Sequence, residues 1–496
     1  MQLITYADRL GGDLRGLHTL LRDQFGGIFD GVHVLPFFDS IDGADAGFDP
    51  VDHTRVDSRL GNWNDVGAIA HDFSVMADLI VNHVSCNSAQ FRDVRKNGRE
   101  SLHWDLFLRK DDVFPADDSD TLIADEISRI YRPRPGAPFT SLSLADGSQV
   151  EFWTTFSNDQ LDINVEIPAG RAYLDSILDK FATAGVKEIR LDAAGYAIKR
   201  RGTACFMLPE TFDFIAELSD RAGRLGMETL VEIHSHYQTQ IAIAASVGRV
   251  YDFALPPLVL HSLYSGDFDA LKRWLTVAPR NCVTVLDTHD GIGIHDVARQ
   301  GDIEGLLADD EVDNLVNTIH ERTGGQSRRA SGHAASNLDI YQVNSTYYDA
   351  LGRNDIEYLI ARAIQFFAPG TPQVYYVGLL AGENDMERVA RTGVGRDINR
   401  HHYSSDEIAA SLQRPVVGQQ MELMRLRNEL AAFSGAFSIQ ASPQSELILR
   451  WDNADSFAEL HVNLVDCRAT IKYKDAGCDG CFDIDVASLQ QQSGDA

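Results

Sequence analysis

The segment Val186–Tyr196, V-K-E-I-R-L-D-A-A-G-Y, places an arginine and a carboxylate where they could do chemistry. Apolar Ile189 and Leu191 predict a buried strand. Because strand side chains alternate, Arg190 and Asp192 then project together from the other face. A carboxylate at a strand end, beside an arginine and before small residues, suits a nucleophile in the mouth of a barrel. The pair equally suits a structural ion pair, and the segment alone favours neither interpretation.

Polar residues gather at the ends of three further predicted strands. They are Asp78, Asn82 and His83 on the third strand, Glu232 and His234 on the fifth, and Asp287, His289 and Asp290 on the seventh. Each group alone is typical of a hydrogen-bonded strand end. Together with Arg190 they would gather like charges at one rim, an arrangement that is costly without a function. The four groups therefore predict an active site.

Strand-like apolar runs alternate with helix-periodic segments along most of the chain. The eight predicted strands are Gln2–Tyr6, Gly31–Pro36, Met76–His83, the strand through Ile189 and Leu191, Met227–His234, Val250–Leu255, Cys282–Asp287 and Gln373–Val377. Eight strands separated by helices indicate an α/β protein with a (β/α)8 TIM barrel, in which catalytic groups occupy the C-terminal strand ends.

Two long polar segments interrupt this alternation, and a different pattern ends the chain. Loops of such length inside a compact domain are expected to form inserted subdomains. Short alternating runs at Glu446–Trp451 and Glu459–Leu464 predict a small antiparallel β-domain. We therefore assign 1–84, 166–290 and 351–432 to the barrel, 85–165 and 291–350 to subdomains inserted after strands 3 and 7, and 433–496 to the C-terminal β-domain.

Composition narrows the classes of partner. The 496 residues carry a formal net charge of −29, which argues against binding nucleic acid or an anionic membrane and favours small-molecule substrates.

Six scattered cysteines indicate free thiols, and the lone C-x-x-C of Cys478 and Cys481 falls short of the roughly four ligands of a zinc site. With no long apolar run and no signal pattern, we expect a cytoplasmic protein without a metal or cofactor.

The polar strand ends resemble the four sequence motifs of α-amylase-type glycoside hydrolases, family 13. The matching motifs are D-x-x-x-N-H from Asp78 to His83, R-x-D from Arg190 to Asp192, the lone Glu232, and H-D at His289 and Asp290. The resemblance implies that Asp192 is the nucleophile of a covalent glycosyl ester, Glu232 the acid/base and Asp290 the transition-state stabiliser, with retention of configuration. Arg190 would orient the nucleophile, and His83 and His289 would contact the same sugar ring.

A narrower resemblance, from Gln2 into the 430s, is to the sucrose phosphorylases. The stretches that carry it are Gly43–Pro50, Tyr131–Gly136, Tyr251–Pro257, Asp287–Gly293, Leu338–Tyr348 and Gly395–Arg400. This family transfers the glucosyl unit of sucrose to inorganic phosphate and releases α-D-glucose 1-phosphate and D-fructose. Phosphate is a substrate here, not a cofactor, and the resemblance also implies a homodimer.

The same resemblance implies further substrate-binding residues. Asp45 and Arg396 would clamp the far edge of the glucosyl unit, with Phe48 as a platform below it. Phe156 would form a wall on the acceptor side, and Gln160 would be a further substrate-binding residue. The remaining implied contacts are Tyr196, Asp339, Tyr341 and Gln342 toward fructose or phosphate, and Arg134 and His234 on phosphate.

Three alternatives stay open at this point. The first is a phosphorylase of sucrose 6′-phosphate, glucosylglycerol or glucosylglycerate, and the second is a sucrose hydrolase or α-glucosidase. The third is a non-catalytic amylase-like binding protein, against which the intact Asp192, Glu232 and Asp290 argue.

Overall fold

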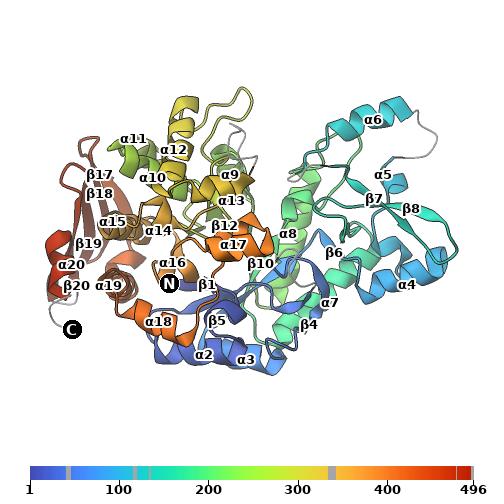
Figure 1. The fold of residues 1–496 in the computed structure, drawn as a ribbon, viewed down its shortest axis with the longest axis horizontal. Helices are drawn as coiled ribbons and strands as arrows, with labels where there is room; N and C mark the ends of the chain where they lie inside the picture. Colours follow the sequence, from blue (N-terminus) through green and yellow to red (C-terminus); the bar gives the residue numbers. More distant parts are fainter. Residues whose placement is uncertain (41–45, 115–119, 133–135, 333–341, 476–477, 493–496) are drawn as a thin grey trace.

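A closed barrel of eight parallel strands forms the centre of the molecule (Figure 1). The computed structural model describes residues 1–40, 46–114, 120–132, 136–332, 342–475 and 478–492. The barrel strands are β1 (Gln2–Thr5), β2 (Gly31–Val34), β5 (Ser74–Ile80), β10 (Glu188–Asp192), β11 (Glu228–Val231), β12 (Arg249–Asp252), β13 (Cys282–Thr284) and β16 (Thr371–Tyr375). The predicted TIM barrel is confirmed, and each predicted strand supplies one of its strands.

Strand β10 lies between β5 and β11, in parallel register with both. All five of its residues are buried, because one face meets the surrounding helices and the other lines the barrel. The register places Arg190 beside Asp78 and leaves Asp192 at the C-terminal end of the strand. The polar residues at these strand ends are thereby brought to one rim.

Helices surround the barrel. The main ones are α2 (Leu14–Asp23), α3 (Trp63–Asp72), α7 (Pro168–Thr183), α8 (Pro209–Arg224), α9 (Tyr237–Ala244), α10 (Leu255–Ser265), α11 (Asp269–Val277), α15 (Asp355–Phe367) and α19 (Pro415–Glu429). Helix α8 shows why they form, since Phe214, Ile215 and Leu218 recur at helical spacing and are buried. At α3, a capping box between Asn62 and Asp65 fixes the helix start.

The first inserted segment has more regular structure than its sequence suggests. Strand β6 (His83–Ser85) leads into it, and it contains α4 (Ala89–Asn97), α5 (Lys110–Val113), α6 (Asp120–Ser128), β7 (Phe139–Ser143), β8 (Gln149–Trp153) and β9 (Gln160–Asp162). Strands β7 and β8 form an antiparallel pair, and β6 pairs with β9. The second pairing joins the segment that enters the insertion to a strand near its end.

The second inserted segment contains two helices where the sequence pattern suggested polar turns. These are α12 (Asp309–Arg322) and α13 (Gln326–Ser331), and the short strands β14 (Ile292–Gly293) and β15 (Gln342–Val343) pair at its two ends. In α12 the buried Val312, Leu315, Val316 and Ile319 follow helical spacing. The many acidic residues between them obscured that period in the sequence.

The C-terminal domain is a five-stranded antiparallel sheet, as predicted. Its strands are β17 (Ala436–Gln440), β18 (Glu446–Asn453), β19 (Ser456–Asn463), β20 (Arg468–Asp475) and β21 (Cys478–Ile484). The indole of Trp451 donates to the carbonyl of Phe367 in α15 over 2.8 Å, which attaches the sheet to the barrel. The sheet and the first inserted segment lie on opposite sides of the barrel (Figure 1).

Shorter elements complete the described chain: β3 (Phe38–Ser40), β4 (Pro50–Val56), α1 (Ala7–Leu10), α14 (Tyr347–Ala350), α16 (Tyr376–Leu379), α17 (Met386–Thr392), α18 (Ser405–Leu412) and α20 (Val486–Gln492). Across the described residues, no helix combines the length and apolarity needed to cross a bilayer.

Candidate active site

Arg190 is the hub of the polar cluster at the barrel rim. Its Nη1 donates to Asp78 Oδ1 over 2.5 Å and to Asp192 Oδ1 over 2.8 Å, while Nη2 lies 2.8 Å from Glu232 Oε1. The guanidinium is only 2% exposed, so these charge-assisted contacts act in a medium of low dielectric constant. One side chain therefore orients the carboxylates that end β10 and follow β11.

Asp78 supports this hub from inside the barrel. Its other oxygen, Oδ2, lies 2.9 Å from His33 Nε2 on β2. Burial alone would raise the pKa of Asp78, but the neighbouring His33 and Arg190 outweigh that effect and lower the pKa to about 2. Asp78 is thus ionised at neutral pH and holds Arg190 in place.

A cavity of about 120 Å³ opens above Arg190. That is below the roughly 300 Å³ at which sites for drug-sized ligands begin, so the cavity suits one small ring. It is lined by Phe48, His83, Phe156, Asp192, Ala193, Gly195, Tyr196, Phe206, Glu232, Ile233, His234, His289, Asp290 and Arg396. All three residues that were predicted to be catalytic line it.

Asp290 faces the cavity from the loop after β13. Arg396 Nη1 lies 2.8 Å from its Oδ1, and Arg400 Nη2 lies 3.8 Å from the same oxygen. Burial alone would raise the pKa of Asp290, but these two guanidinium groups, Arg396 foremost, hold the pKa far below its usual range. The carboxylate is therefore negative whenever a substrate enters.

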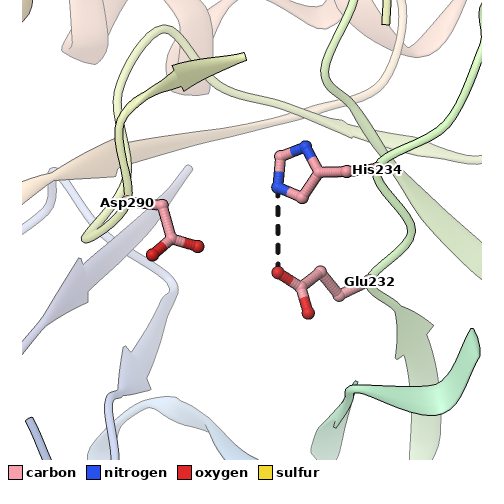
Figure 2. Close-up of side chains that lie close together, drawn as sticks. All are labelled: Glu232, His234 and Asp290. Carbon is pink, nitrogen blue, oxygen red and sulfur yellow. Dashed lines mark ion pairs between the residues drawn. The ribbon is translucent and has the colours of Figure 1, made fainter. Parts of the chain in front are cut away.

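His234 also lines the cavity and lies opposite Asp290 (Figure 2). Its Nε2 lies 3.8 Å from Glu232 Oε1, and its Nδ1 lies 3.4 Å from Asp296 Oδ2. Burial alone would lower the pKa of His234, but the carboxylates of Asp296, Glu232 and Asp290 outweigh burial and raise the pKa. These carboxylates thereby stabilise the imidazolium form of His234.

Phe48 and His289 form the apolar side of the cavity. Their rings stack with centroids 4.9 Å apart and planes 8° apart. The carbonyl of Phe48 accepts hydrogen bonds from His83 Nε2 over 2.9 Å and from Gln160 Nε2 over 3.1 Å. Burial lowers the pKa of His289 well below its ordinary value, so that ring is neutral.

Aromatic residues build the wall nearest the inserted subdomain. The ring of Tyr196 lies 5.1 Å from that of Phe156, 4.7 Å from Phe206 and 6.2 Å from Tyr131. Phe156 comes from the loop between β8 and β9, whereas Tyr196 follows β10. The barrel and the insertion thus each contribute to this wall.

Some predicted residues stand behind the cavity lining. Gln160 Nε2 donates to the carbonyl of Phe48, whereas Gln342 Nε2 lies 3.4 Å from His234 Nε2 and Gln342 Oε1 lies 3.3 Å from Arg396 Nη2. Asp287 turns away from the cavity and pairs with Arg362 of α15 over 2.9 Å. Predictions for Asp45, Arg134, Asp339 and Tyr341 fall outside the described residues.

Several supporting residues were not singled out from the sequence. Phe206 lines the cavity, Arg400 contacts Asp290, Asp296 contacts His234, and Lys199 contacts the backbone of Tyr196. Arg400 ends the segment Gly395–Arg400, so a family motif could have revealed it. The other three carry no local signal: Asp296 contacts His234, 62 residues away, and Lys199 also contacts Asn82, 117 residues away.

Glu232, His234 and Asp290 could also act as metal ligands. Within the part of the chain that the structure describes, they form one group whose ligand atoms all lie within 4.8 Å of one another. Each carboxylate, however, already has an arginine at 2.8 Å. Guanidinium groups thus supply the positive charge that a metal would otherwise bring.

Residues 5–245 match the alpha-amylase catalytic domain family. A sucrose phosphorylase from Agrobacterium vitis is 55% identical over 97% of this chain and 98% of its own length. A sucrose phosphorylase from Bifidobacterium adolescentis is 51% identical over 93% of this chain and 91% of its own. The crystal structure of sucrose 6F-phosphate phosphorylase from Thermoanaerobacter thermosaccharolyticum superposes with a TM-score of 0.90, at 37% identity, over 97% of both chains.

Proposed function

Because the chain belongs to the sucrose phosphorylase family, within the alpha-amylase-type glycoside hydrolases, we propose that it transfers a glucosyl unit from sucrose to phosphate. The products are α-D-glucose 1-phosphate and D-fructose. One observation carries this proposal: a single buried guanidinium, that of Arg190, contacts both Asp192 and Glu232 at the base of a small cavity. This contact favours the short separation, about 5 Å, between the two carboxylates of a retaining enzyme.

In the first step, Asp192 attacks the anomeric carbon of the glucosyl unit while Glu232 donates a proton to the departing fructose oxygen. The bond from glucose to fructose breaks, and an ester bond to Asp192 forms. Positive charge that develops on the sugar ring is stabilised by the ionised Asp290. The cost of desolvating Asp290 is already offset by Arg396 and Arg400.

In the second step, phosphate takes the place of fructose. Glu232 accepts a proton from the phosphate as its oxygen attacks the anomeric carbon, and the ester to Asp192 breaks. Two inversions leave the configuration retained. The imidazolium of His234, beside Glu232, supports binding of the phosphate anion at this position.

Small cavity volume supports an exo-acting enzyme that holds one glucosyl unit. Phe48 and His289 offer an apolar surface to the sugar ring, and Arg396 lies at the cavity edge. The aromatic wall of Phe156 and Tyr196 would face the acceptor.

The proposal is tested by incubating the protein with sucrose, with and without phosphate. We expect glucose 1-phosphate to form in the presence of phosphate, with fructose release much slower in its absence. Release of free glucose at equal rates would instead indicate a hydrolase. Sucrose 6′-phosphate, glucosylglycerol and glucosylglycerate in parallel reactions distinguish the related phosphorylases.

The nucleophile is tested by Asp192→Asn. Loss of covalent catalysis should reduce kcat by about 10⁴-fold or more, as for nucleophiles in other enzymes. The variant should retain its fold, because asparagine can still accept a hydrogen bond from Arg190. Turnover close to that of the wild type would refute the assignment.

Three expectations drawn from the sequence stay predictions. They are a homodimer, activity without a metal or cofactor, and a cytoplasmic location. The molar mass in solution tests the first, activity after exhaustive chelation the second, and fractionation of the source cells the third.

A further inference from the structure

Lys199 is a buried lysine seven residues beyond the proposed nucleophile. It is 6% exposed, and its ammonium group contacts three oxygen atoms. Nζ donates to Asn82 Oδ1 over 2.8 Å and to the carbonyl of Tyr196, and it lies 2.7 Å from Asp162 Oδ2. An ammonium group has three N–H donors. All three are therefore used within the protein, and none is left to bind a substrate.

Each of these acceptors belongs to, or adjoins, the cavity wall. Asn82 precedes His83, and Tyr196 itself lines the cavity. Asp162, at the end of β9, accepts from the backbone N–H of Thr155 over 3.0 Å and from its hydroxyl over 2.6 Å. Thr155 in turn precedes Phe156. One ammonium group thus connects three loops that carry His83, Phe156 and Tyr196.

We propose that Lys199 is a positioning residue that holds the Phe156–Tyr196 wall in place on the acceptor side of the cavity, and so favours phosphate over water as the acceptor. This inference rests on the proposed glucosyl transfer. The two rings come from different segments and meet at 5.1 Å, so their spacing depends on what joins those segments. A wall that moves by a fraction of an ångström would admit water to the glucosyl ester and misplace phosphate.

A neighbouring ion pair provides the matched control. Arg201 Nε lies 2.7 Å from Glu126 Oε2 in α6, which also joins the loop after β10 to the insertion. Neither of these two residues lines the cavity. Replacing Arg201 therefore removes a link between the barrel and the insertion without replacing a residue of the cavity wall.

The test compares Lys199→Met with Arg201→Met and the wild type. For Lys199→Met we expect the share of turnover that ends in free glucose, and the KM for phosphate, to rise about tenfold. Fructose release should slow far less, because Asp192, Glu232 and Asp290 keep their arginines. Wild-type values for Lys199→Met would overturn the proposal, as would an equal change in Arg201→Met.

A second variant covers the case in which Lys199→Met fails to fold because Asp162 is left as a buried, unpaired charge. In the double variant Lys199→Met/Asp162→Asn that charge is removed, while the asparagine oxygen can still accept from Thr155. The same rise in hydrolysis and in phosphate KM is expected, and wild-type values would again overturn the proposal.

Amide hydrogen exchange tests the positioning role of Lys199 independently of the reaction that the enzyme catalyses. We expect faster exchange at the Thr155 amide in Lys199→Met than in Arg201→Met or the wild type, whatever reaction the enzyme catalyses. Unchanged exchange in Lys199→Met would contradict the positioning role. A wild-type protein that forms no glucose 1-phosphate would contradict only the function.

Discussion

His234 gains its charge from residues on three different segments. Asp296, in the loop after β14, lies 3.4 Å from Nδ1, and it is fully buried. It is held by the backbone N–H of Ser235 over 3.2 Å and by Gln240 over 2.6 Å. Glu232 and Asp290 face the other side of the ring. Asp296 is the only one of these three carboxylates that the proposed mechanism does not use directly, so its effect on His234 can be isolated.

Replacing Asp296 by asparagine should weaken phosphate binding. The Asp296 carboxylate helps to raise the pKa of His234, so its removal lowers that pKa and the imidazolium is lost at a lower pH. We expect the phosphate KM of Asp296→Asn to rise about tenfold at neutral pH, the value of one hydrogen bond to a charged group. At a pH low enough to protonate His234 in both proteins, the two values should converge.

Steady-state kinetics over a range of pH measures this effect, with KM for sucrose as the internal control. Sucrose is neutral, so its KM should change little. A rise in phosphate KM that is independent of pH would show that Asp296 acts on phosphate through structure alone.

At the scale of elements, the turn after β10 sets the position of the nucleophile. Ala193 has a φ of 56°, in the left-handed region, at the start of the short helical turn Ala194–Tyr196. This turn directs the chain away from the barrel directly after Asp192 and brings Tyr196 to the cavity. A non-glycine residue in this conformation costs about 1–2 kcal/mol. The strained residue, Ala193, thus directly follows Asp192, whose carboxylate would attack the sugar.

Substitutions at Ala193 should therefore change stability in opposite directions. Ala193→Gly should raise the free energy of unfolding by up to about 1 kcal/mol, the relief of strain exceeding the added freedom of the unfolded chain. Ala193→Val should lower it by about 2 kcal/mol, because a β-branched side chain tolerates positive φ poorly. Thermal unfolding measures both, and a stable valine variant would contradict the assigned strain.

The barrel strands could be predicted from the sequence because they are short apolar runs buried on both faces. The β7–β8 hairpin could not, since β7 has no fully buried residue and contains no apolar run. The proposed catalytic residues were visible because each ends or follows a barrel strand. Lys199 and Asp296 were not, because their roles depend on contacts between segments up to 117 residues apart.

At the scale of the whole molecule, the strong negative charge works against one of the two substrates. A protein with a formal net charge of −29 repels the phosphate anion as it approaches, whereas neutral sucrose is unaffected. Near the cavity, Arg396, Arg400 and His234 supply positive charge, but Arg396 and Arg400 are shared with Asp290. The acidic surface therefore repels phosphate over long distances, whereas the cations beside the cavity attract it only at short range.

Salt should separate these two effects. The Debye length falls from about 30 Å at 10 mM to about 8 Å at 150 mM salt, so added salt screens distant acidic residues before it screens contacts inside the cavity. We expect kcat/KM for phosphate to rise about two- to threefold over this range, with kcat/KM for sucrose constant. Both are measured in sodium chloride at fixed pH. A fall in kcat/KM for phosphate would mean that the local cations attract phosphate from solution, and that the acidic surface has no part in its capture.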